Sequence, residues 1–506
     1  MGRFVLFLAA GLALSCGLAT AQSGNSACEG LRTFRDSSFK VVSADYTGPG
    51  PFNLPRMGPS TPPPIDLPAH CTVRIITATS PDSAVTVELW LPDPSAWNSK
   101  VLATGNGGYS STLSYLQMAQ ALRDGYAVGG SNTGHEGNGL DFGVDHPEKI
   151  RDWAYRSTHV LAQNAKQVAA AFYGKAARYS YFVGCSTGGQ QGLSEVQRYP
   201  KDFEGVVAGD PGNDRILLNA DFVESWLITH PADGKPFAAA KLSLLNKAAV
   251  AACDKQDGVA EGVIDDPTKC SFDPGSLACG PTGDTGSCLT EAEIAMVRHL
   301  YDGPVRNSSG EPIYPGWPRG SEAGWGSYLI SPSQPVRIEF WSSWIFGQKA
   351  FSLRSFNSVD AIATARVKLP YVEAVDPDLR AFQKRGGKLL MYHGWADPVV
   401  PPQDTINYYL EVKNILGKTT ADTVRLFMVP GMGHCGGGPG ASTFDALAAL
   451  DAWVTGINVP DYIPAAHRSA GSDSFTRPLC AFPKVARWDV HGDSSQASSF
   501  RCTADH

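Results

Sequence analysis

Residues 179–192 have the sequence YSYFVGCSTGGQQG, in which an apolar run meets a glycine-rich turn and then a helical pattern. Tyr179–Val183 is typical of a buried strand, and Gln190–Tyr199 is typical of a helix. Between them, Gly184–Gly188 matches G-x-S-x-G, whose glycines allow a sharp strand-to-helix turn. Such a turn lifts the Ser186 hydroxyl above the sheet, and the helix N-terminus behind it favours a developing anion. The chain contains 53 glycines, so the pattern alone also arises by chance and its context must support it.

The same alternation of strands and helices continues on both sides of this turn. The predicted strands are Lys100–Thr104, Tyr126–Gly129, Gly205–Ala208, Lys388–His393 and Val424–Val429. The predicted helices are Leu113–Arg123, His159–Tyr173, Asp404–Leu416 and Phe444–Val454. This order predicts an α/β fold with a mainly parallel sheet and helices on both faces. We expect residues 22–66 to form loops and Val85–Leu91 to form a half-exposed strand.

The alternation stops between about Pro211 and Val375, where four cysteines and several Gly/Pro turns occur. Five tryptophans also fall in this stretch: Trp226, Trp317, Trp325, Trp341 and Trp344. The sequence therefore predicts one domain from residues 22–210 and 376–506, with a second domain, residues 211–375, inserted into it.

Composition excludes several classes of protein. The 506 residues include 42 Lys and Arg against 49 Asp and Glu, so the formal net charge is −7. A charge of this sign, without a basic run, argues against a nucleic-acid partner. Hydrophobic residues make up 43% of the chain, which is enough for a large core and argues against disorder.

The N-terminus has the features of an export signal. Arg3 precedes the apolar run Phe4–Leu14, and Ala19-Thr20-Ala21 is an A-x-A cleavage site. We therefore expect residues 1–21 to be a signal peptide and the mature protein to be secreted or periplasmic. The run is shorter than the roughly 20 residues of a membrane span, so no membrane anchor is expected after cleavage.

The cysteine count agrees with an oxidising compartment. Eleven cysteines minus Cys16 leave ten, an even number. Proximity in the sequence suggests four disulfides: Cys28 with Cys71, Cys253 with Cys270, Cys279 with Cys288, and Cys480 with Cys502. A zinc site is disfavoured because no C-x-x-C pair occurs.

A serine nucleophile needs a base and an acid that orients the base. In folds with this turn the chain order is serine, acid, histidine. His434 is the best candidate base, because it lies in a Gly-rich loop just after the last predicted strand. Asp397 is the best candidate acid, because it follows a strand at the sheet edge where ligands collect. Asp376 and Asp378 are weaker candidates, since they precede that strand.

A tetrahedral intermediate also needs donors for its oxyanion. The amide of Thr187, directly after the nucleophile, is one candidate. The second is the amide of Gly108, or of its neighbour Gly107, in a loop after an early strand. A plain tight turn would have the same glycines.

Cys185 precedes the candidate nucleophile and Cys435 follows the candidate base. A disulfide between them would hold the two catalytic loops together. Two unrelated thiols are the alternative, although free thiols are disfavoured in an exported protein.

The arrangement Cys-Ser, Asp and His-Cys resembles the tannase/feruloyl esterase family of α/β hydrolases, which includes a bacterial mono(2-hydroxyethyl) terephthalate hydrolase. The similar segments span nearly the whole mature chain: Gly105–Gly108, Gly184–Gly192, Tyr314–Glu322, His393–Pro398 and Gly431–Cys435. The resemblance implies an α/β-hydrolase fold with a large inserted lid domain over the active site. It also implies the disulfide between Cys185 and Cys435.

Residues 254–263, DKQDGVAEGV, carry three carboxylates with a glycine between them, as a loop around a hard cation would. An acidic surface loop is the alternative. The resemblance implies a structural Ca²⁺, bound by the side chains of Asp254, Asp257 and Glu261 and by the carbonyls of Val259 and Val263. Glu261 stands where the family usually has Asp, and its longer side chain is expected to change the geometry or weaken the affinity.

The substrate is less well defined by the sequence. The five tryptophans could stack an aromatic acyl group or could form the core of the lid. Arg319 could pair with a substrate carboxylate or lie on the surface, and His393 could line the pocket.

The resemblance implies a secreted serine carboxylic-ester hydrolase that cleaves esters of phenolic acids, such as galloyl or feruloyl esters, through an acyl-enzyme. An esterase acting on mono(2-hydroxyethyl) terephthalate is the alternative within this class. A non-catalytic polyphenol- or carbohydrate-binding protein and a peptidase are alternatives from other classes.

Overall fold

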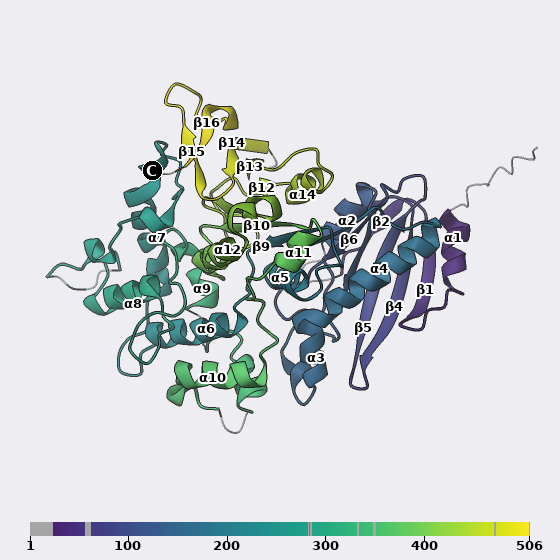
Figure 1. The fold of residues 1–506 in the computed structure, drawn as a ribbon. Helices are drawn as coiled ribbons and strands as arrows, with labels where there is room; N and C mark the ends of the chain where they lie inside the picture. Colours follow the sequence, from purple (N-terminus) through teal and green to yellow (C-terminus); the bar gives the residue numbers. More distant parts are fainter. Residues whose placement is uncertain are drawn as a thin grey trace, which may run out of the picture.

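The computed structural model describes residues 24–55, 62–281, 283, 286–330, 333–347, 351–469 and 472–504. Its centre is a nine-stranded sheet in the order β1-β4-β5-β7-β6-β8-β9-β10-β11 (Figure 1). The bounds are β1 (Lys40–Thr47), β4 (His70–Ser80), β5 (Ser83–Pro92), β6 (Lys100–Thr104), β7 (Ala127–Ser131), β8 (Tyr179–Cys185), β9 (Gly205–Gly209), β10 (Lys388–Gly394) and β11 (Val424–Val429). The predicted signal peptide lies outside the described residues.

The sheet is parallel from β7 to β11, as the alternation of strands and helices predicts, and antiparallel among β1, β4, β5 and β7. The parallel strands are mostly apolar, as expected for strands whose two faces are both covered by helices. Val101 and Leu102 of β6 illustrate this, since these neighbours are buried in two different hydrophobic clusters. The carboxyl ends of β8, β10 and β11 therefore meet at one edge of the sheet.

One face of the sheet is covered by α4 (Ser157–Tyr173), α5 (Thr187–Arg198) and α12 (Pro402–Leu416). The other face is covered by α2 (Tyr115–Arg123) and α14 (Ala446–Val454). Short helices α3 (Pro147–Arg151), α11 (Arg380–Lys384) and α13 (Thr420–Thr423) complete this part of the fold.

The expectation that residues 22–66 are loops is wrong. They contain α1 (Gly24–Leu31), β1, β2 (Gly50–Phe52) and β3 (Ile65–Leu67). In β1 only Ala44 is buried, so the strand lies at the edge of the sheet and lacks a strong apolar pattern. The expected half-exposed strand is also more buried than predicted, because β5 lies between β4 and β7 and is covered from Val87 onwards.

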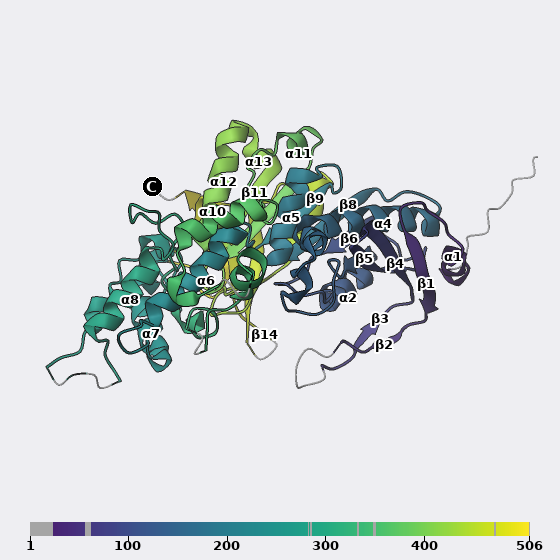
Figure 2. The same ribbon diagram turned by 90° about the horizontal axis from the view of Figure 1, so that it is seen from below.

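Between β9 and β10 the chain forms α6 (Arg215–Thr229), α7 (Leu242–Cys253), α8 (Glu291–Asp302), α9 (Trp325–Tyr328) and α10 (Ser358–Lys368). These helices lie at the opposite end of the molecule from β1 (Figures 1 and 2). They share a hydrophobic cluster of their own that also reaches Tyr109 and Trp153. The boundaries of the inserted domain, and its role as a lid, stay predictions.

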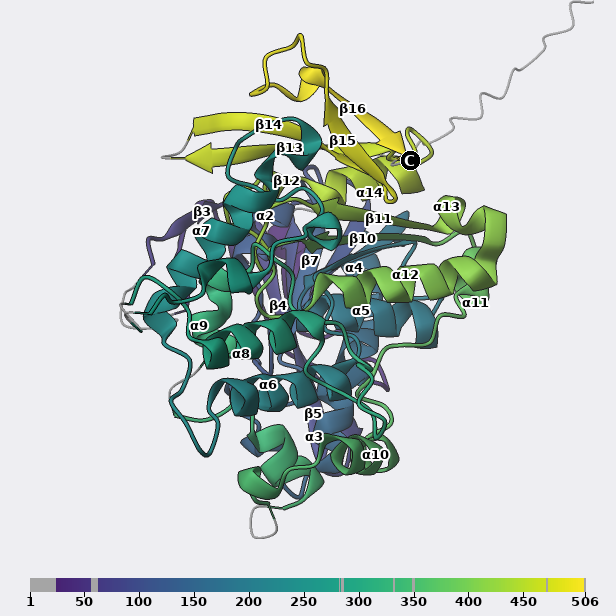
Figure 3. The same cartoon turned by 90° about the vertical axis from the view of Figure 1, so that its left-hand side faces the viewer.

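The last part of the chain forms strands that the sequence did not predict. A three-stranded sheet contains β12 (Thr443–Phe444), β13 (Tyr462–Ser469) and β14 (Ser472–Cys480), and β15 (Lys484–Trp488) pairs with β16 (Phe500–Ala504). Figure 3 shows these strands beyond β10 and β11. Among the described residues, no helix is long and apolar enough to cross a membrane.

The described part of the chain contains five disulfides. Four join cysteines that are close to each other in the sequence: Cys28–Cys71, Cys253–Cys270, Cys279–Cys288 and Cys480–Cys502. The fifth joins Cys185 to Cys435, across 250 residues. These are the pairs suggested by the sequence and by the family resemblance.

Candidate active site

Ser186 lies in the turn between β8 and α5 with a backbone φ of 64°. An L-residue in this left-handed region is strained, as a nucleophile in a strand-to-helix turn often is. A Cβ atom at Gly184 would lie 2.5 Å from the backbone of Gly188, so the strand and helix approach this closely only because residue 184 is glycine. The Ser186 amide donates to the Gly209 carbonyl at 2.9 Å, which fixes the turn against β9.

His434 and Asp397 form a hydrogen-bonded pair. His434 Nδ1 lies 2.7 Å from Asp397 Oδ2. The other Asp397 oxygen, Oδ1, accepts hydrogen bonds from the amides of Val399 and Val400 at 2.7 and 3.0 Å. Asp397 is fully buried, so these contacts hold its carboxylate in a single orientation.

The electrostatics of this pair suit a base and its acid. Burial would raise the pKa of Asp397, but His434 and His393 outweigh burial and lower that pKa well below its usual value. Burial would lower the pKa of His434, but the Asp397 carboxylate outweighs it and raises that pKa. An ionised carboxylate that binds one ring nitrogen leaves the other, Nε2, free to accept a proton.

The disulfide brings the serine and histidine loops together. Its Cα atoms, at Cys185 and Cys435, lie 5.9 Å apart, and each belongs to a direct neighbour of Ser186 or His434. Ser186 and His434 line the same cavity of about 940 Å³. The acid, the base and the nucleophile thus come from the carboxyl ends of β10, β11 and β8.

The loop after β6 supplies the candidate oxyanion donors. Gly107 and Gly108 line the cavity, and Gly108 has a φ of 56°. Trp153 Nε1 donates to the Gly108 carbonyl at 3.1 Å, which anchors the loop. Thr187 is the first residue of α5, and its hydroxyl accepts from Arg215 at 2.9 Å. Helix starts have free amides, so the Thr187 N–H is available to an anion.

The residues expected at the substrate lie elsewhere. Among the described residues that line the cavity, the aromatic side chains are Tyr109, Tyr328 and Tyr392, and none of the five tryptophans occurs. Arg319 donates to the Phe272 carbonyl at 2.8 Å and does not line the cavity. Arg337 does, 5.0 Å from the Tyr109 ring centre. The sequence did not single out Arg337, because an isolated arginine carries no signal.

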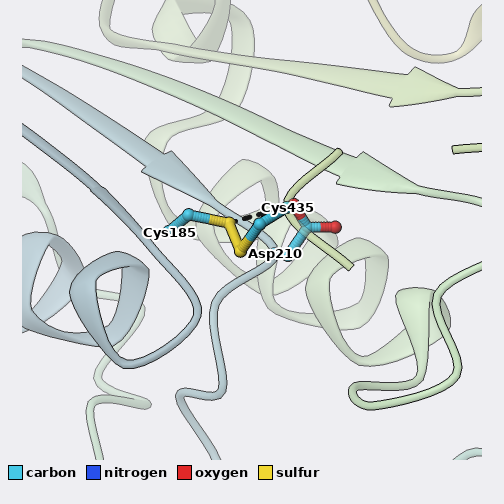
Figure 4. A group of neighbouring side chains, drawn as sticks. All are labelled: Cys185, Asp210 and Cys435. Carbon is cyan, nitrogen blue, oxygen red and sulfur yellow. Dashed lines mark hydrogen bonds between the residues drawn. A yellow bond between two sulfur atoms is a disulfide. The ribbon is translucent and has the colours of Figure 1, made fainter. Parts of the chain in front are cut away.

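His393 lies behind the acid rather than in the cavity. It is fully buried, and its Nε2 is 3.2 Å from Asp397 Oδ2. A second buried carboxylate, Asp210, follows β9 and lies 3.7 Å from the same ring nitrogen. Asp210 also contacts the disulfide between Cys185 and Cys435, as Figure 4 shows. Asp210 was not predicted from the sequence, although it lies shortly after the predicted strand Gly205–Ala208, one residue beyond Gly209.

The predicted calcium loop follows α7. Asp254 Oδ1 accepts hydrogen bonds from the amides of Glu261, Gly262 and Val263 at 2.9–3.1 Å, which folds the loop around this side chain. Asp257, Glu261 and Val263 line one small cavity. Burial raises the pKa of the Glu261 carboxyl, and Asp254 and Asp257 add to that effect.

Carboxylate oxygens, which this loop carries on Asp254, Asp257 and Glu261, fit a hard divalent cation in their chemistry. The Arg477 guanidinium of β14 also pairs with Glu261 and lowers its pKa. The three carboxylates are not among the groups of the described residues whose ligand atoms all lie within 4.8 Å of one another. Calcium would therefore have to share Glu261 with Arg477.

Comparisons with known proteins agree with this geometry. The family model for tannase and feruloyl esterase matches residues 71–503. The chain belongs to the tannase and feruloyl esterase family.

Members of this family resemble the chain over most of its length. Feruloyl esterase B of Aspergillus niger is 33% identical, over 85% of this chain and 86% of its own. Mono(2-hydroxyethyl) terephthalate hydrolase of Piscinibacter sakaiensis is 31% identical, over 87% of this chain and 85% of its own. The crystal structure of feruloyl esterase B from Aspergillus oryzae superposes with a TM-score of 0.87 at 28% identity, covering 95% of this chain and all of that one.

Family membership and fold establish the enzyme class. The protein is a carboxylic ester hydrolase with an α/β-hydrolase fold, of the feruloyl esterase and tannase type.

Proposed function

We propose that this protein hydrolyses esters of aromatic acids through a covalent acyl-enzyme, with Ser186 as nucleophile, His434 as base and Asp397 as the acid that orients the base. The observation that carries the proposal is the 2.7 Å contact between His434 Nδ1 and Asp397 Oδ2. The loop of His434 is also joined to the loop of Ser186 by the disulfide between Cys435 and Cys185. A buried carboxylate on Nδ1 fixes the tautomer in which Nε2 accepts a proton.

In the acylation step, Ser186 Oγ attacks the ester carbonyl carbon while His434 Nε2 takes the hydroxyl proton. The carbonyl oxygen becomes an oxyanion and accepts hydrogen bonds from the amides of Thr187 and Gly108. The tetrahedral intermediate then expels the alcohol, which takes its proton from His434. In deacylation, a water gives a proton to His434, attacks the acyl carbon and releases the acid, and Ser186 regains its proton.

The acyl group that we propose is a phenolic acid of the galloyl or feruloyl type. Relatives of this chain include feruloyl esterases, and the cavity at Ser186 contains three tyrosines. Aromatic side chains at a pocket suit an aromatic acyl group, because rings pack in stacked or edge-on pairs.

Four esters compared side by side test the proposal: methyl gallate, methyl ferulate, methyl benzoate and mono(2-hydroxyethyl) terephthalate. We expect the phenolic esters to be cleaved fastest, and Ser186→Ala to abolish turnover with little change in melting temperature. Labelling of Ser186 by an organophosphorus probe is the control for a competent nucleophile. A protein that binds phenolics but neither cleaves these esters nor reacts with the probe would instead be a non-catalytic binding protein.

A monoester with a free carboxylate is the second candidate, because Arg337 supplies a cation in the cavity. Arg337→Leu should then raise KM for the terephthalate monoester and leave KM for methyl benzoate nearly unchanged. An equal change for both esters would exclude recognition of the carboxylate by Arg337.

We further propose that the loop of residues 254–263 binds a structural Ca²⁺ through the side chains of Asp254, Asp257 and Glu261 and the carbonyls of Val259 and Val263. The ion would join the carboxylates and stabilise the loop that the Cys253–Cys270 disulfide closes. Metal analysis of the dialysed protein and its melting temperature with EDTA test this site. Absence of calcium, together with an unchanged melting temperature, would exclude it.

We also propose that the protein acts outside the cytoplasm, as a secreted or periplasmic enzyme. The leader-like residues 1–21 and the five disulfides support this location. Sequencing the N-terminus of the exported protein should give Gln22 as its first residue.

A further inference from the structure

Asp210 is a buried carboxylate in an unusual backbone position. It follows β9 directly, has no exposed surface and adopts a φ of 38°. Its Oδ1 accepts a hydrogen bond from the Gly394 amide at 2.9 Å, and its own amide donates to the Tyr392 carbonyl at 2.9 Å. A strained residue whose carboxylate is held in place at the carboxyl end of a strand points to a functional role.

The His393 ring lies between Asp210 and the acid of the candidate triad. Its Nε2 faces three acceptors: Asp397 Oδ2 at 3.2 Å, the Val400 carbonyl at 3.1 Å and Asp210 Oδ1 at 3.7 Å. A nitrogen surrounded by acceptors must carry a proton, so Nε2 is the donor. Nδ1 then accepts from the Thr405 hydroxyl at 2.7 Å. The His393 Nε2–H is thus within hydrogen-bond distance of Asp397, whereas Asp210, at 3.7 Å, faces the same N–H and acts on it by its charge.

Asp210 also lies against the covalent link between the serine and histidine loops. Its Oδ2 is 3.3 Å from Cys185 Sγ, and Figure 4 shows the carboxylate beside the disulfide to Cys435. The Gly209 carbonyl, one residue earlier, accepts the Ser186 amide. The segment that carries Asp210 therefore touches the nucleophile, the disulfide and the strand before the acid.

We propose that Asp210 is a positioning residue of the catalytic centre. It is a second carboxylate, which acts on Asp397 through His393 and on His434 by its charge. Its effect is to favour the imidazolium form of His434. This role rests on the proposed function. The acid of the centre would then be a chain of Asp210, His393 and Asp397 rather than Asp397 alone.

The charges around Asp210 agree with this role. The pKa of Asp210 is raised to about 6, because burial and the Asp397 carboxylate, which raise it, outweigh His393 and His434, which lower it. Burial has the largest single effect on the pKa of His434 and lowers it. Asp397, and then Asp210, raise that pKa, and the net shift is upward. Arg337 opposes them by lowering the pKa of His434. Burial, and then the charge of Asp210, raise the pKa of the Tyr392 phenol. A negative Asp210 therefore stabilises the imidazolium that forms when Ser186 attacks.

Asp210→Asn is the variant that isolates the charge. It keeps the size of the side chain and an oxygen for the Gly394 amide, and asparagine tolerates a positive φ. Asp202→Asn is a matched control, because Asp202 is also buried and is paired with a histidine, with its Oδ2 2.5 Å from His159 Nδ1. It lies before β9, at the opposite end of that strand from Asp210.

The first measurement is the pH dependence of Ser186 labelling by a fluorophosphonate, together with kcat/KM for the best ester. We expect Asp210→Asn to move the midpoint of the acidic limb down by about half a unit to one unit, because a negative charge near His434 is lost. The plateau rate should fall by up to about tenfold. Asp202→Asn should leave the midpoint at the wild-type value.

A uniform loss of rate with an unchanged midpoint would mean that Asp210 only supports the fold, and would overturn the proposal. An equal shift in Asp202→Asn would overturn it as well.

The second measurement is NMR titration of ring-labelled histidines, with His434→Gln used to assign the His434 signal. The midpoint of His434 should fall in Asp210→Asn whether or not any ester is cleaved. If the wild-type protein neither cleaves esters nor reacts with the probe, the proposed function fails, and the titration still decides the role of Asp210. An unchanged His434 midpoint would refute it.

Discussion

The disulfide between Cys185 and Cys435 gives the sharpest test of how the catalytic loops are held. We consider Cys185→Ser combined with Cys435→Ser. The bond links loops 250 residues apart in sequence, with Cα atoms 5.9 Å apart. Its loss should affect both the stability of the fold and the alignment of Ser186 with His434.

The expected loss of stability follows from loop length. In the chain-entropy model, closing a loop of 250 residues stabilises the folded state by about 5.5 kcal/mol at 25 °C, and a loop of nine residues by about 2.6 kcal/mol. The first value is an upper bound, because engineered and natural disulfides commonly contribute 2–4 kcal/mol. Cys279–Cys288 is the nine-residue loop and serves as the matched control.

The two disulfides are expected to differ in their effect on the catalytic rate. Removing Cys185–Cys435 frees both loops, and a misplacement of about 1 Å between nucleophile and base can lower a rate by about 10²-fold. Removing Cys279–Cys288 should reduce the melting temperature alone, since it does not line the cavity of Ser186.

The assay combines thermal unfolding with kcat and KM for the best ester. We expect kcat to fall at least tenfold in the Cys185/Cys435 variant and to stay near wild type in the Cys279/Cys288 variant. Wild-type kcat in the first variant, at a temperature where it is folded, would refute the reasoning that this bond aligns the site.

Three further outcomes are expected. Because Asp397 raises the pKa of His434, kcat/KM should decline on the acidic side of a pH–rate profile with a midpoint above 6.5, the usual pKa of histidine. A midpoint below 6.5 would contradict the pairing of His434 with Asp397. Gly108→Ala should lower kcat about 10- to 100-fold with a small change in melting temperature. The φ of 56° at this residue disfavours alanine, so the amide proposed to donate to the oxyanion would move. An unchanged kcat would exclude Gly108 as a donor. Glu261→Asp should tighten calcium binding in calorimetric titration, because the shorter arm withdraws from Arg477; weaker binding would show that the longer side chain is required.

The parallel part of the fold could be predicted because each of its strands carries its own signal. Tyr179–Cys185 and Lys388–Gly394 are short, mainly apolar runs with a glycine at the last or the second-last position, and the next residues begin turns and helices. In such a sheet the carboxyl ends meet, so residues after these strands were expected to converge. The contact of His434 with Asp397 agrees with that expectation.

Edge strands and later strands could not be predicted in the same way. Only Ala44 of β1 is buried, and β1 is recognised by its pairing with β4 and by the nearby Cys28–Cys71 bond rather than by its own pattern. The strands β13 and β14 pack in one hydrophobic cluster with α14 and β11, and β15 and β16 contact β14. Their existence therefore depends on tertiary contacts that a local pattern does not contain.

The contacts of His393 and Asp210 behind the candidate triad also could not be predicted from a local pattern. His393 is one residue from the end of β10, and this place at the end of the strand before Asp397 made it a candidate for the pocket. Its ring instead faces Asp210 and Asp397, two acids that lie on different loops and are 187 residues apart in sequence. A single sequence marks the serine, the histidine and their flanking cysteines by local pattern. The second carboxylate has no such mark, because its role depends on which strand lies beside β10. Local sequence pattern therefore indicates candidates for the reacting residues, whereas candidates for the groups around them require the order of strands in the sheet.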